Sequence, residues 1–270
     1  KNAKKSLDKL NLRHRHYIKS EKYKGEIHFS TGSNTARSSS NFYALNNGIA
    51  TLFEIRGVGI GKTSFKRRIN SGLSVGFSFL KTAYENSIFI FDEIAKANTY
   101  SNVIVLEHQR SIYTDVIKAI DIGSNEMIDF ETTMHSSKDS YAISKRDRPL
   151  AYIIKQNNFG FIEKLKDVGI DYVELQKDTV IYSGGYRVIE FNDNFKVYEK
   201  MRMQKVVTSI EYNDNGFSKG DILISMNQKR SNLIAELLEP EAPNSYVSFG
   251  IINTSLNSQL PIYRIKNLNN

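Results

Sequence analysis

The chain has 270 residues, no cysteine and a formal net charge of +8. Its length allows one large domain or two ordinary ones, and the absence of cysteine excludes disulfides, thiolate zinc sites and cysteine nucleophiles. A hydrophobic content of 40% with 11% aromatic residues argues against disorder. No apolar run approaches the roughly 20 residues of a membrane helix, so we expect no membrane span.

Most of the net positive charge lies in the first 24 residues. Such a basic segment raises nucleic acid as a partner, but no RNP, zinc-finger or helix-turn-helix signature accompanies it. We therefore expect a solvated segment and no nucleic-acid partner. His14 and His16 stand at a spacing that places both rings on one face of an extended chain. No third ligand follows at a recognisable spacing, so we expect no metal site in this chain.

Residues 45–55, LNNGIATLFEI, indicate a turn at Asn46-Asn47-Gly48 that leads into a buried strand. Gly61-Lys62-Thr63 follows and looks like the end of a phosphate-binding loop. Such a loop needs its first glycine at position 56, because the intervening backbone must wrap around the phosphates. Arg56 stands there. We therefore interpret the stretch as a turn and exclude a nucleotide site.

Apolar residues at helical spacing follow this turn, and Thr63 or Ser64 is placed to cap the helix that they predict. Because they fall on one face, we expect a long helix that packs against a core. The stripe consists of Phe65, Ile69, Leu73, Phe77, Leu80, Tyr84, Ile88 and Phe91.

The rest of the chain alternates short strand-like and helix-like runs, with a charged connecting segment at 136–149. Expected strands lie at 102–108, 126–135, 149–154, 171–176, 186–191, 221–226, 245–252 and 261–265, and expected helices at 159–170 and 231–240. The pattern predicts an α/β part with a mixed sheet and a long helix, followed by a smaller α+β module.

A strand that ends in Phe-Glu-Ile-Arg-Gly, with an Asn-Gly turn before it and a long helix after it, resembles the zinc carboxypeptidases of the carboxypeptidase A type. The stretch TGSNTARSSSNFYALNNGIATLFEIRGVGIGKTSFKRR is more similar to a bacterial branch, in which Arg-x-x-x-Asn-x-Tyr-x-Leu precedes the glutamate. RPLAYII and GDILISMNQKRSNLIAELLEPE resemble the C-terminal extension of those proteins. The resemblance covers most of residues 29–266.

The resemblance implies three regions. Residues 1–98 are the C-terminal portion of a carboxypeptidase-like catalytic domain, residues 99–148 are a β-rich connecting segment, and residues 149–270 are an accessory α+β module. The function implied is that of a zinc metallocarboxypeptidase, a hydrolase that removes C-terminal residues from peptides. We expect a secreted or cell-envelope location.

In this family a carboxylate takes a proton from the attacking water and returns it to the leaving amine. By resemblance Glu54 is that general base and acid. Without the resemblance, Glu54 is a strand-end residue paired to Arg56 or to a nearby lysine. The zinc ligands, a His-x-x-Glu pair and a later histidine, are missing, because none of the five histidines is followed by Glu three residues later. The chain is then either the C-terminal portion of a longer enzyme or a member of a non-metal branch. We expect the first, in which the zinc, the cofactor of the full-length protein, is held by an upstream half and this chain is an inactive fragment by itself.

Arg37 and Tyr43 are the candidate substrate-binding residues. Arg37 lies in the loop where classical members carry a mobile tyrosine, and a guanidinium can bind a peptide carboxylate bidentately. A plain loop arginine or one that stabilises the fold is the other interpretation. Tyr43 stands where the family has a structural aromatic residue, so packing competes with substrate contact. The alternative function is a non-catalytic binding module for peptide or cell-wall carbohydrate, in which residues 149–270 use exposed aromatics such as Tyr152, Tyr172 and Tyr182.

Overall fold

A computed structural model describes residues 1–57, 59, 61–97, 101–155 and 159–266. Helix accounts for 26% and strand for 41% of the chain, in two sheets, which confirms the predicted α/β class. The chain forms two compact units. Unit 1 comprises residues 1–33, 50–99 and 110–140, and unit 2 comprises residues 34–49, 100–109 and 141–270. The three regions expected from the sequence stay a prediction.

Unit 1 contains most of a four-stranded sheet with the strand order β1-β2-β4-β3. The strands are β1 (Ile18–Tyr23), β2 (Glu26–Thr31), β3 (Val103–Ile120) and β4 (Met127–Asp147). β1 and β2 form an antiparallel hairpin, whereas β2 and β4 run parallel. The hairpin turns at Lys24 and Gly25, both at positive φ, where glycine is at no steric disadvantage.

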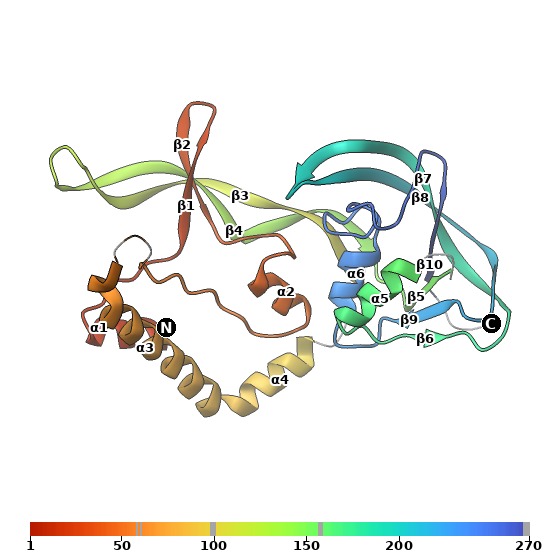
Figure 1. The fold of residues 1–270 in the computed structure, drawn as a ribbon, viewed down its shortest axis with the longest axis horizontal. Coiled ribbons are helices and arrows are strands. Elements are labelled where there is room, and N and C mark those ends of the chain that lie inside the picture. The colour runs from red at the N-terminus through yellow and green to blue at the C-terminus, as the bar shows by residue number, and fades with distance from the viewer. Residues whose placement is uncertain (58, 60, 98–100, 156–158, 267–270) are drawn as a thin grey trace. The chain divides into compact units, whose positions relative to one another are not determined.

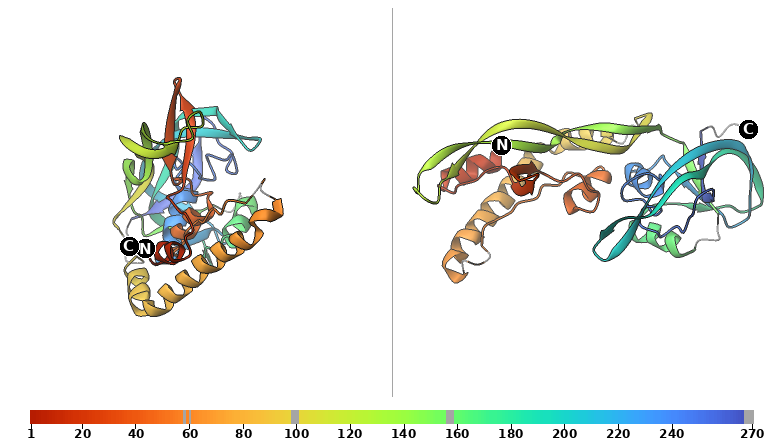
Figure 2. Two further views of the ribbon diagram at one scale, coloured as in Figure 1. Left: turned by 90° about the vertical axis from the view of Figure 1, so that its left-hand side faces the viewer. Right: turned by 90° about the horizontal axis from the view of Figure 1, so that it is seen from above.

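The predicted long helix of unit 1 is present, but it is divided at Asn86 into α3 (Phe65–Glu85) and α4 (Ser87–Ala97) (Figures 1 and 2). A short 3-10 turn, η1 (Gly61–Ser64), leads into α3, and Ser64 is its N-cap, although its side chain makes no capping hydrogen bond. α1 (Asn2–Lys9) packs against α3, where the Asn2 amide donates to Thr82 Oγ1 at 3.0 Å. No helix in the described ranges is long and apolar enough to cross a membrane.

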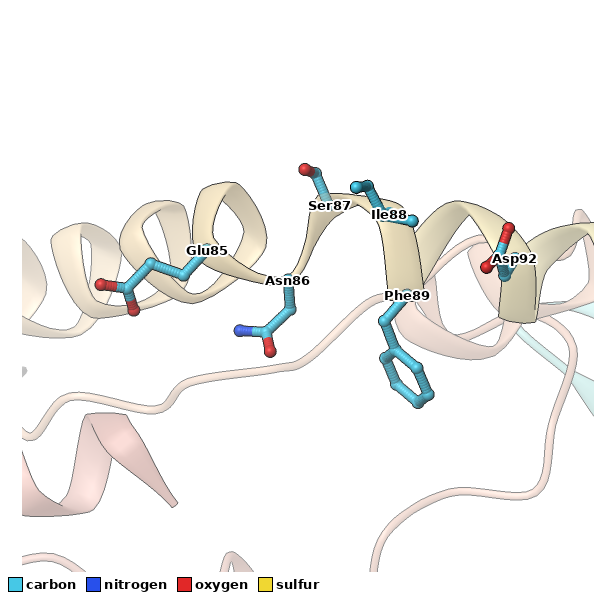
Figure 3. A pocket seen from close by; sticks show the side chains of 6 residues that line it. All are labelled: Glu85, Asn86, Ser87, Ile88, Phe89 and Asp92. Atoms are coloured by element: carbon cyan, nitrogen blue, oxygen red, sulfur yellow. The ribbon is translucent and has the colours of Figure 1, made fainter.

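The expected burial of this helix is wrong. Val75 is the one described residue of α3 and α4 that is buried, and the predicted apolar stripe is exposed. Periodicity records which face of a helix is apolar, but burial requires a partner surface. The six residues Glu85, Asn86, Ser87, Ile88, Phe89 and Asp92 line a hollow of about 400 Å³ at the bend between the two helices (Figure 3). None of the predicted site residues belongs to it.

Unit 2 is built on a six-stranded sheet with the order β6-β9-β5-β10-β7-β8, in which the described pairings are antiparallel. Its strands are β5 (Ala151–Ile154), β6 (Val173–Glu174), β7 (Thr179–Tyr198), β8 (Met201–Phe217), β9 (Ile222–Ser225) and β10 (Gln259–Ile265). Its helices are α2 (Ser39–Leu45), α5 (Phe159–Asp167) and α6 (Ser231–Leu238).

The core of unit 2 follows from strand alternation. Along β5, Tyr152 and Ile154 face the main hydrophobic cluster, whereas Ala151 and Ile153 face a smaller cluster on the other side. α5 and α6 contribute to the main cluster, and Figure 1 shows both helices beside this sheet. The predicted helices at 159–170 and 231–240 and the strands at 149–154, 221–226 and 261–265 are confirmed within a few residues.

Two predicted strands are wrong. Residues 48–57 have no regular secondary structure and are almost all exposed, so Glu54 is not at the end of a strand. No strand within the described ranges pairs with this segment, and a strand needs such a partner for its backbone groups. Residues 245–252 form turns because Ser245 and Ser248 hydrogen-bond the carbonyls of Pro240 and Ala242.

β4 is longer than predicted. It continues as a strand through residues 136–147, where the sequence suggested a charged connecting segment. α2, β1, β2 and β8 were not predicted as elements.

Candidate functional site

The segment that carries Arg37 and Tyr43, residues 34–49, belongs to unit 2 and is fixed to α6 and its preceding turn. Asn46 Oδ1 accepts a hydrogen bond of 2.8 Å from Arg230 Nε, and Asn47 Nδ2 donates to the carbonyl of Lys229 at 3.1 Å. Leu45 packs against the main core of the unit. The polar and apolar contacts together hold α2 and the loop before it on the rest of unit 2.

The loop before α2 is shaped by Thr35. Its carbonyl accepts hydrogen bonds from the Ser38 hydroxyl at 3.2 Å and from Asn41 Nδ2 at 3.0 Å. Its hydroxyl accepts from the Arg37 backbone N–H at 3.4 Å, the geometry of a threonine turn. Because these bonds fix the backbone, they also fix the point from which the Arg37 side chain leaves the loop.

The Arg37 guanidinium lies against two aromatic rings. Its central carbon is 3.9 Å from the ring centroid of Tyr198 and 5.3 Å from that of Phe249. Nη1 donates to Asn244 Oδ1 at 2.5 Å. Arg37 is exposed and, in the described part of the chain, forms no ion pair. An arginine that is held in place but lacks a carboxylate partner is suited to bind an anionic ligand.

Tyr43 is 56% exposed. Its ring lies over Gly48, where an added Cβ would come within 2.3 Å of a ring carbon, so glycine leaves the space that the tyrosine occupies. The Tyr43 carbonyl also accepts the backbone N–H of Gly48 at 3.0 Å. Tyr43 is thus in contact with its own turn, and its role in substrate binding stays a prediction.

Glu54 lies in unit 1, in the stretch without regular secondary structure. The residues on either side contact α3: the ring of Phe53 packs edge-on against Phe79 with centroids 5.0 Å apart, and Ile55 lies beside Gly72. Glu54 itself is exposed, and it forms no ion pair or hydrogen bond with any residue that the structure describes. The pairing with Arg56 or a lysine that the alternative interpretation requires is therefore not formed.

The turn after Glu54 is held by arginines. Arg67 Nη2 donates to the Arg56 carbonyl at 3.4 Å, and a Cβ at Gly57 would come within 2.1 Å of the Arg68 side chain. Val58 and Ile60 of the apparent phosphate loop lie outside the described residues.

The described residues do not form a metal centre. In the ranges that the structure describes, no group of three or more His, Cys, Asp or Glu side chains could hold a metal ion. His14 hydrogen-bonds Asp8 at 2.8 Å, and His16 lies beside Lys138 and Lys4, whose charges lower its pKa. A histidine that faces two ammonium groups is a poor cation ligand. The described residues therefore do not fit the zinc that the resemblance implies.

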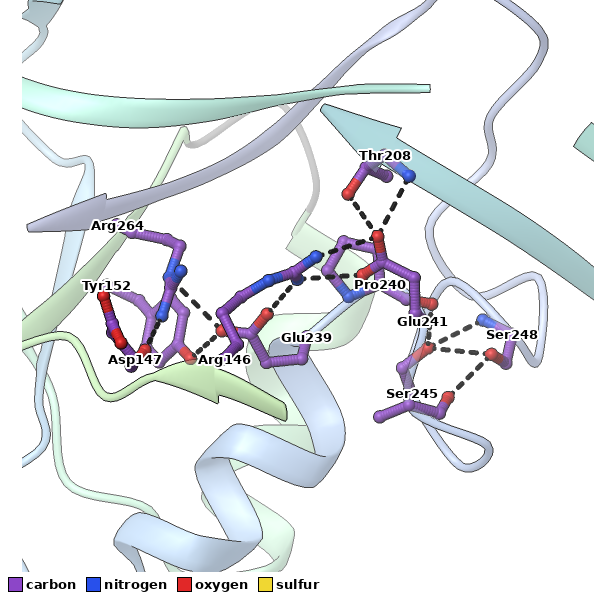
Figure 4. A network of polar contacts seen from close by, with 11 residues as sticks. Arg146, Asp147, Tyr152, Thr208, Glu239, Pro240, Glu241, Ser245, Ser248 and Arg264 are labelled. Carbon is purple, nitrogen blue, oxygen red and sulfur yellow. Dashed lines mark hydrogen bonds and ion pairs between the residues drawn. The ribbon is translucent and has the colours of Figure 1, made fainter. Parts of the chain in front are cut away.

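Unit 2 contains a buried ionic network that the sequence alone did not indicate (Figure 4). Glu239, at 0% exposed, accepts a hydrogen bond from Tyr152 Oη at 2.5 Å and pairs with Arg146 at 2.5 Å and Arg264 at 3.3 Å. Glu241 pairs bidentately with Arg146 at 2.9 and 3.0 Å. Burial, with the Glu239 charge, raises the pKa of Tyr152, so its hydroxyl stays a donor. The segment LLEPE carries both glutamates, but nothing local marks their partners.

Comparison with known proteins gives relatives over nearly the whole chain. Carboxypeptidase 2 of Trichophyton equinum is 26% identical over 267 residues, which is 97% of this chain and 50% of the relative. Carboxypeptidase 2 of Trichophyton rubrum is 27% identical over 230 residues, 84% of this chain and 43% of the relative. The chain is similar to fungal carboxypeptidases.

The chain spans about half the length of the curated relatives that it matches. No family model matches the sequence, and no solved structure matches it. The bacterial branch expected from the sequence stays a prediction, because these relatives are fungal.

Proposed function

We propose that this chain is part of a zinc metallocarboxypeptidase that hydrolyses the C-terminal residues of peptides. The observation that carries the proposal is the similarity, over 97% of the chain, to a protein named carboxypeptidase 2. That similarity supports a peptidase function in general. The zinc chemistry, the substrate and the residue roles below are our proposal, with zinc ligands that lie outside the described residues.

Glu54 acts in this proposal as the general base and acid. Its carboxylate takes a proton from the attacking water and transfers it to the leaving amine. An exposed carboxylate without an internal partner is available for that exchange, whereas one held in an ion pair would have to break it. Phe53 and Ile55, which contact α3, restrain the backbone on both sides of the acid.

Arg37 binds the C-terminal carboxylate of the peptide in this proposal. Bidentate binding of a carboxylate by guanidinium is charge-assisted and directional, and it distinguishes a free C-terminus from an internal peptide bond. Substrates with an amidated C-terminus should therefore bind poorly.

The test is a steady-state assay of the protein expressed from its complete reading frame, on one peptide with a free C-terminus and the same peptide amidated. Glu54→Gln should keep the fold and lower kcat about 10²- to 10⁴-fold, because an amide cannot accept the proton. Glu131→Gln, which removes another exposed carboxylate of unit 1, should keep wild-type turnover. Turnover by the Glu54→Gln protein near that of wild type would refute the proposed role and the carboxypeptidase assignment.

The alternative is a non-catalytic module that binds peptide or cell-wall carbohydrate. Of its three candidate aromatics, Tyr152 is fully buried, and Tyr172 is half-buried and packs against the core. Tyr182 is exposed and stacks on Tyr212 with ring centroids 5.9 Å apart. Only one of the three predicted aromatics is therefore exposed, whereas a binding surface requires several. For this reason we favour the peptidase.

A further inference from the structure

The residues that surround Arg37 come from residues 149–270, which the sequence predicted to be a C-terminal module. Tyr198 is the last residue of β7, whereas Asn244 and Phe249 lie in the turns that follow α6. The rings of Tyr198 and Phe249 meet edge to face with centroids 6.4 Å apart. The two rings support each other, and the face of Tyr198 on which the guanidinium lies has a fixed orientation.

The second constraint on Arg37 is a chain of hydrogen bonds. Asn244 Nδ2 donates to Glu236 Oε1 at 2.5 Å, and its Oδ1 accepts from Arg37 Nη1 at 2.5 Å. Because the carboxylate can only accept, the Asn244 amide has one orientation, with its oxygen toward Arg37. One edge of the guanidinium is thereby fixed, while stacking on Tyr198 fixes its plane.

These contacts restrain the guanidinium without forming an ion pair with it in the described residues. Asn244 and the aromatic rings carry no formal charge, and Glu236, which interacts with the Arg37 charge through space, forms its hydrogen bond with Asn244 rather than with Arg37. Pre-organising a charged donor in this way lowers the conformational entropy that is lost when a ligand binds.

We propose that Tyr198, Asn244 and Phe249 are positioning residues that hold Arg37 in the orientation in which it binds the carboxylate of a peptide C-terminus. The inference rests on the proposed function and extends it, because all three residues come from the C-terminal module. The C-terminal module then supplies the residues that position Arg37 against the peptide carboxylate.

The test measures carboxylate binding directly on the 270-residue chain. The probe is benzoylglycine, a small molecule that ends like a peptide, and benzoylglycinamide is its uncharged control. The readout is the Nε–Hε signal of Arg37 in ¹⁵N-arginine-labelled protein, assigned by its loss in Arg37→Lys. Arg187, which is paired with Glu211 on β7 and β8, is the internal reference.

Benzoylglycine should shift the Arg37 signal saturably and leave the Arg187 signal in place, and benzoylglycinamide should shift neither. Tyr198→Leu and Asn244→Ala should each weaken benzoylglycine binding about tenfold, the range of a lost cation–π contact or hydrogen bond to a charged group. Tyr198→Phe keeps the ring and should restore binding to within about twofold of wild type. Tyr182→Leu removes an exposed tyrosine of the same strand and should have no effect.

Equal shifts of Arg37 and Arg187, or unchanged affinity in Tyr198→Leu and Asn244→Ala proteins that melt like wild type, would overturn the inference. The assay requires neither zinc nor turnover. If the protein from the complete reading frame hydrolyses no peptide, while benzoylglycine still binds Arg37 in a Tyr198-dependent way, the positioning residues stand and the peptidase proposal falls.

Discussion

At the scale of single residues, Glu239 is one whose position is constrained by its buried partners. Glu239 is enclosed by Arg146, Arg264 and Tyr152, and each of its oxygens has a partner at 3.3 Å or less. Arg264 is only 1% exposed, so its charge has no access to water if Glu239 is removed. A buried ion pair adds little stability compared with apolar residues, but breaking one side of it is costly.

Glu239→Ala should therefore destabilise unit 2 by about 3–5 kcal/mol, because it leaves buried arginine charge uncompensated. Chemical denaturation followed by circular dichroism measures this loss. Glu211→Ala breaks the half-exposed pair with Arg187 and should cost under about 1 kcal/mol. Equal losses for both variants would show that the network around Glu239 does not stabilise the core.

The stability of the folded chain should depend on pH through the Glu236 carboxyl. Burial raises its pKa above the ordinary value of 4.5, although hydrogen bonds from Asn244 and the Arg37 charge oppose the shift. The folded chain therefore keeps a proton that the unfolded chain releases, and the stability contributed by this carboxyl is complete below pH 4.5 and lost as pH rises through the raised pKa.

Glu236→Gln has no such proton and can still accept from Asn244. Its Tm relative to wild type should therefore increase as the pH is raised from 4.5 to 7. Thermal melts across that range measure the difference, with Glu190→Gln, an exposed glutamate of the same unit, as the control. If the difference in Tm between Glu236→Gln and wild type stays constant with pH, the raised pKa of Glu236 is contradicted.

At the scale of elements, α3 was correctly predicted to be a helix, but its apolar side chains were wrongly predicted to be buried. Its sequence forms a helix of 21 residues, yet Phe77 and Leu80 are exposed, at 66% and 69%. Contiguous exposed apolar patches are uncommon on soluble monomers and mark sites of interaction or aggregation. The apolar face of α3 should therefore govern the solution behaviour of the 270-residue chain.

Leu80→Lys should cost less than about 0.5 kcal/mol of stability, since an exposed substitution loses few contacts. It should also lower the binding of an apolar dye and the tendency to self-associate. Val75→Lys on the same helix places a charge at a buried position and should cost about 2 kcal/mol or more. Dye fluorescence, light scattering and thermal melts make the comparison. Strong destabilisation by Leu80→Lys would show that this face is covered in solution.

At the scale of the whole molecule, the residues expected to act together are divided between the two units. Arg37 and Tyr43 belong to unit 2 and Glu54 to unit 1. The curated relatives are about twice as long as the matched region. The proposed activity requires zinc ligands that the described residues do not supply, and zinc binding is the property that tests it.

We predict that the 270-residue chain does not bind zinc tightly. His28 and His135 lie together, but their nitrogens share a hydrogen bond of 2.9 Å. Calorimetric titration with zinc should show no tight equimolar site. A tight site would overturn the prediction and would direct attention to His14, His16 and His28.

The sequence by itself determined those features that depend on near neighbours. The apolar periodicity of α3, α5 and α6 and the short buried strands β5, β9 and β10 were recognisable, because side chains that alternate or repeat along one element record which face is apolar. Glu54 and Arg37 were recognised from motifs only a few residues long, by resemblance to a family.

The tertiary structure decided which of those faces and groups have partners. Arg37 and Asn244 are 207 residues apart in sequence, and Glu239 and Arg146 are 93 residues apart. Residues 48–55 have the composition of a strand but pair with no strand in the described ranges, and the apolar face of α3 remains exposed. Local composition sets a preference for burial or pairing, whereas only the path of the whole chain supplies the surface or strand that satisfies it.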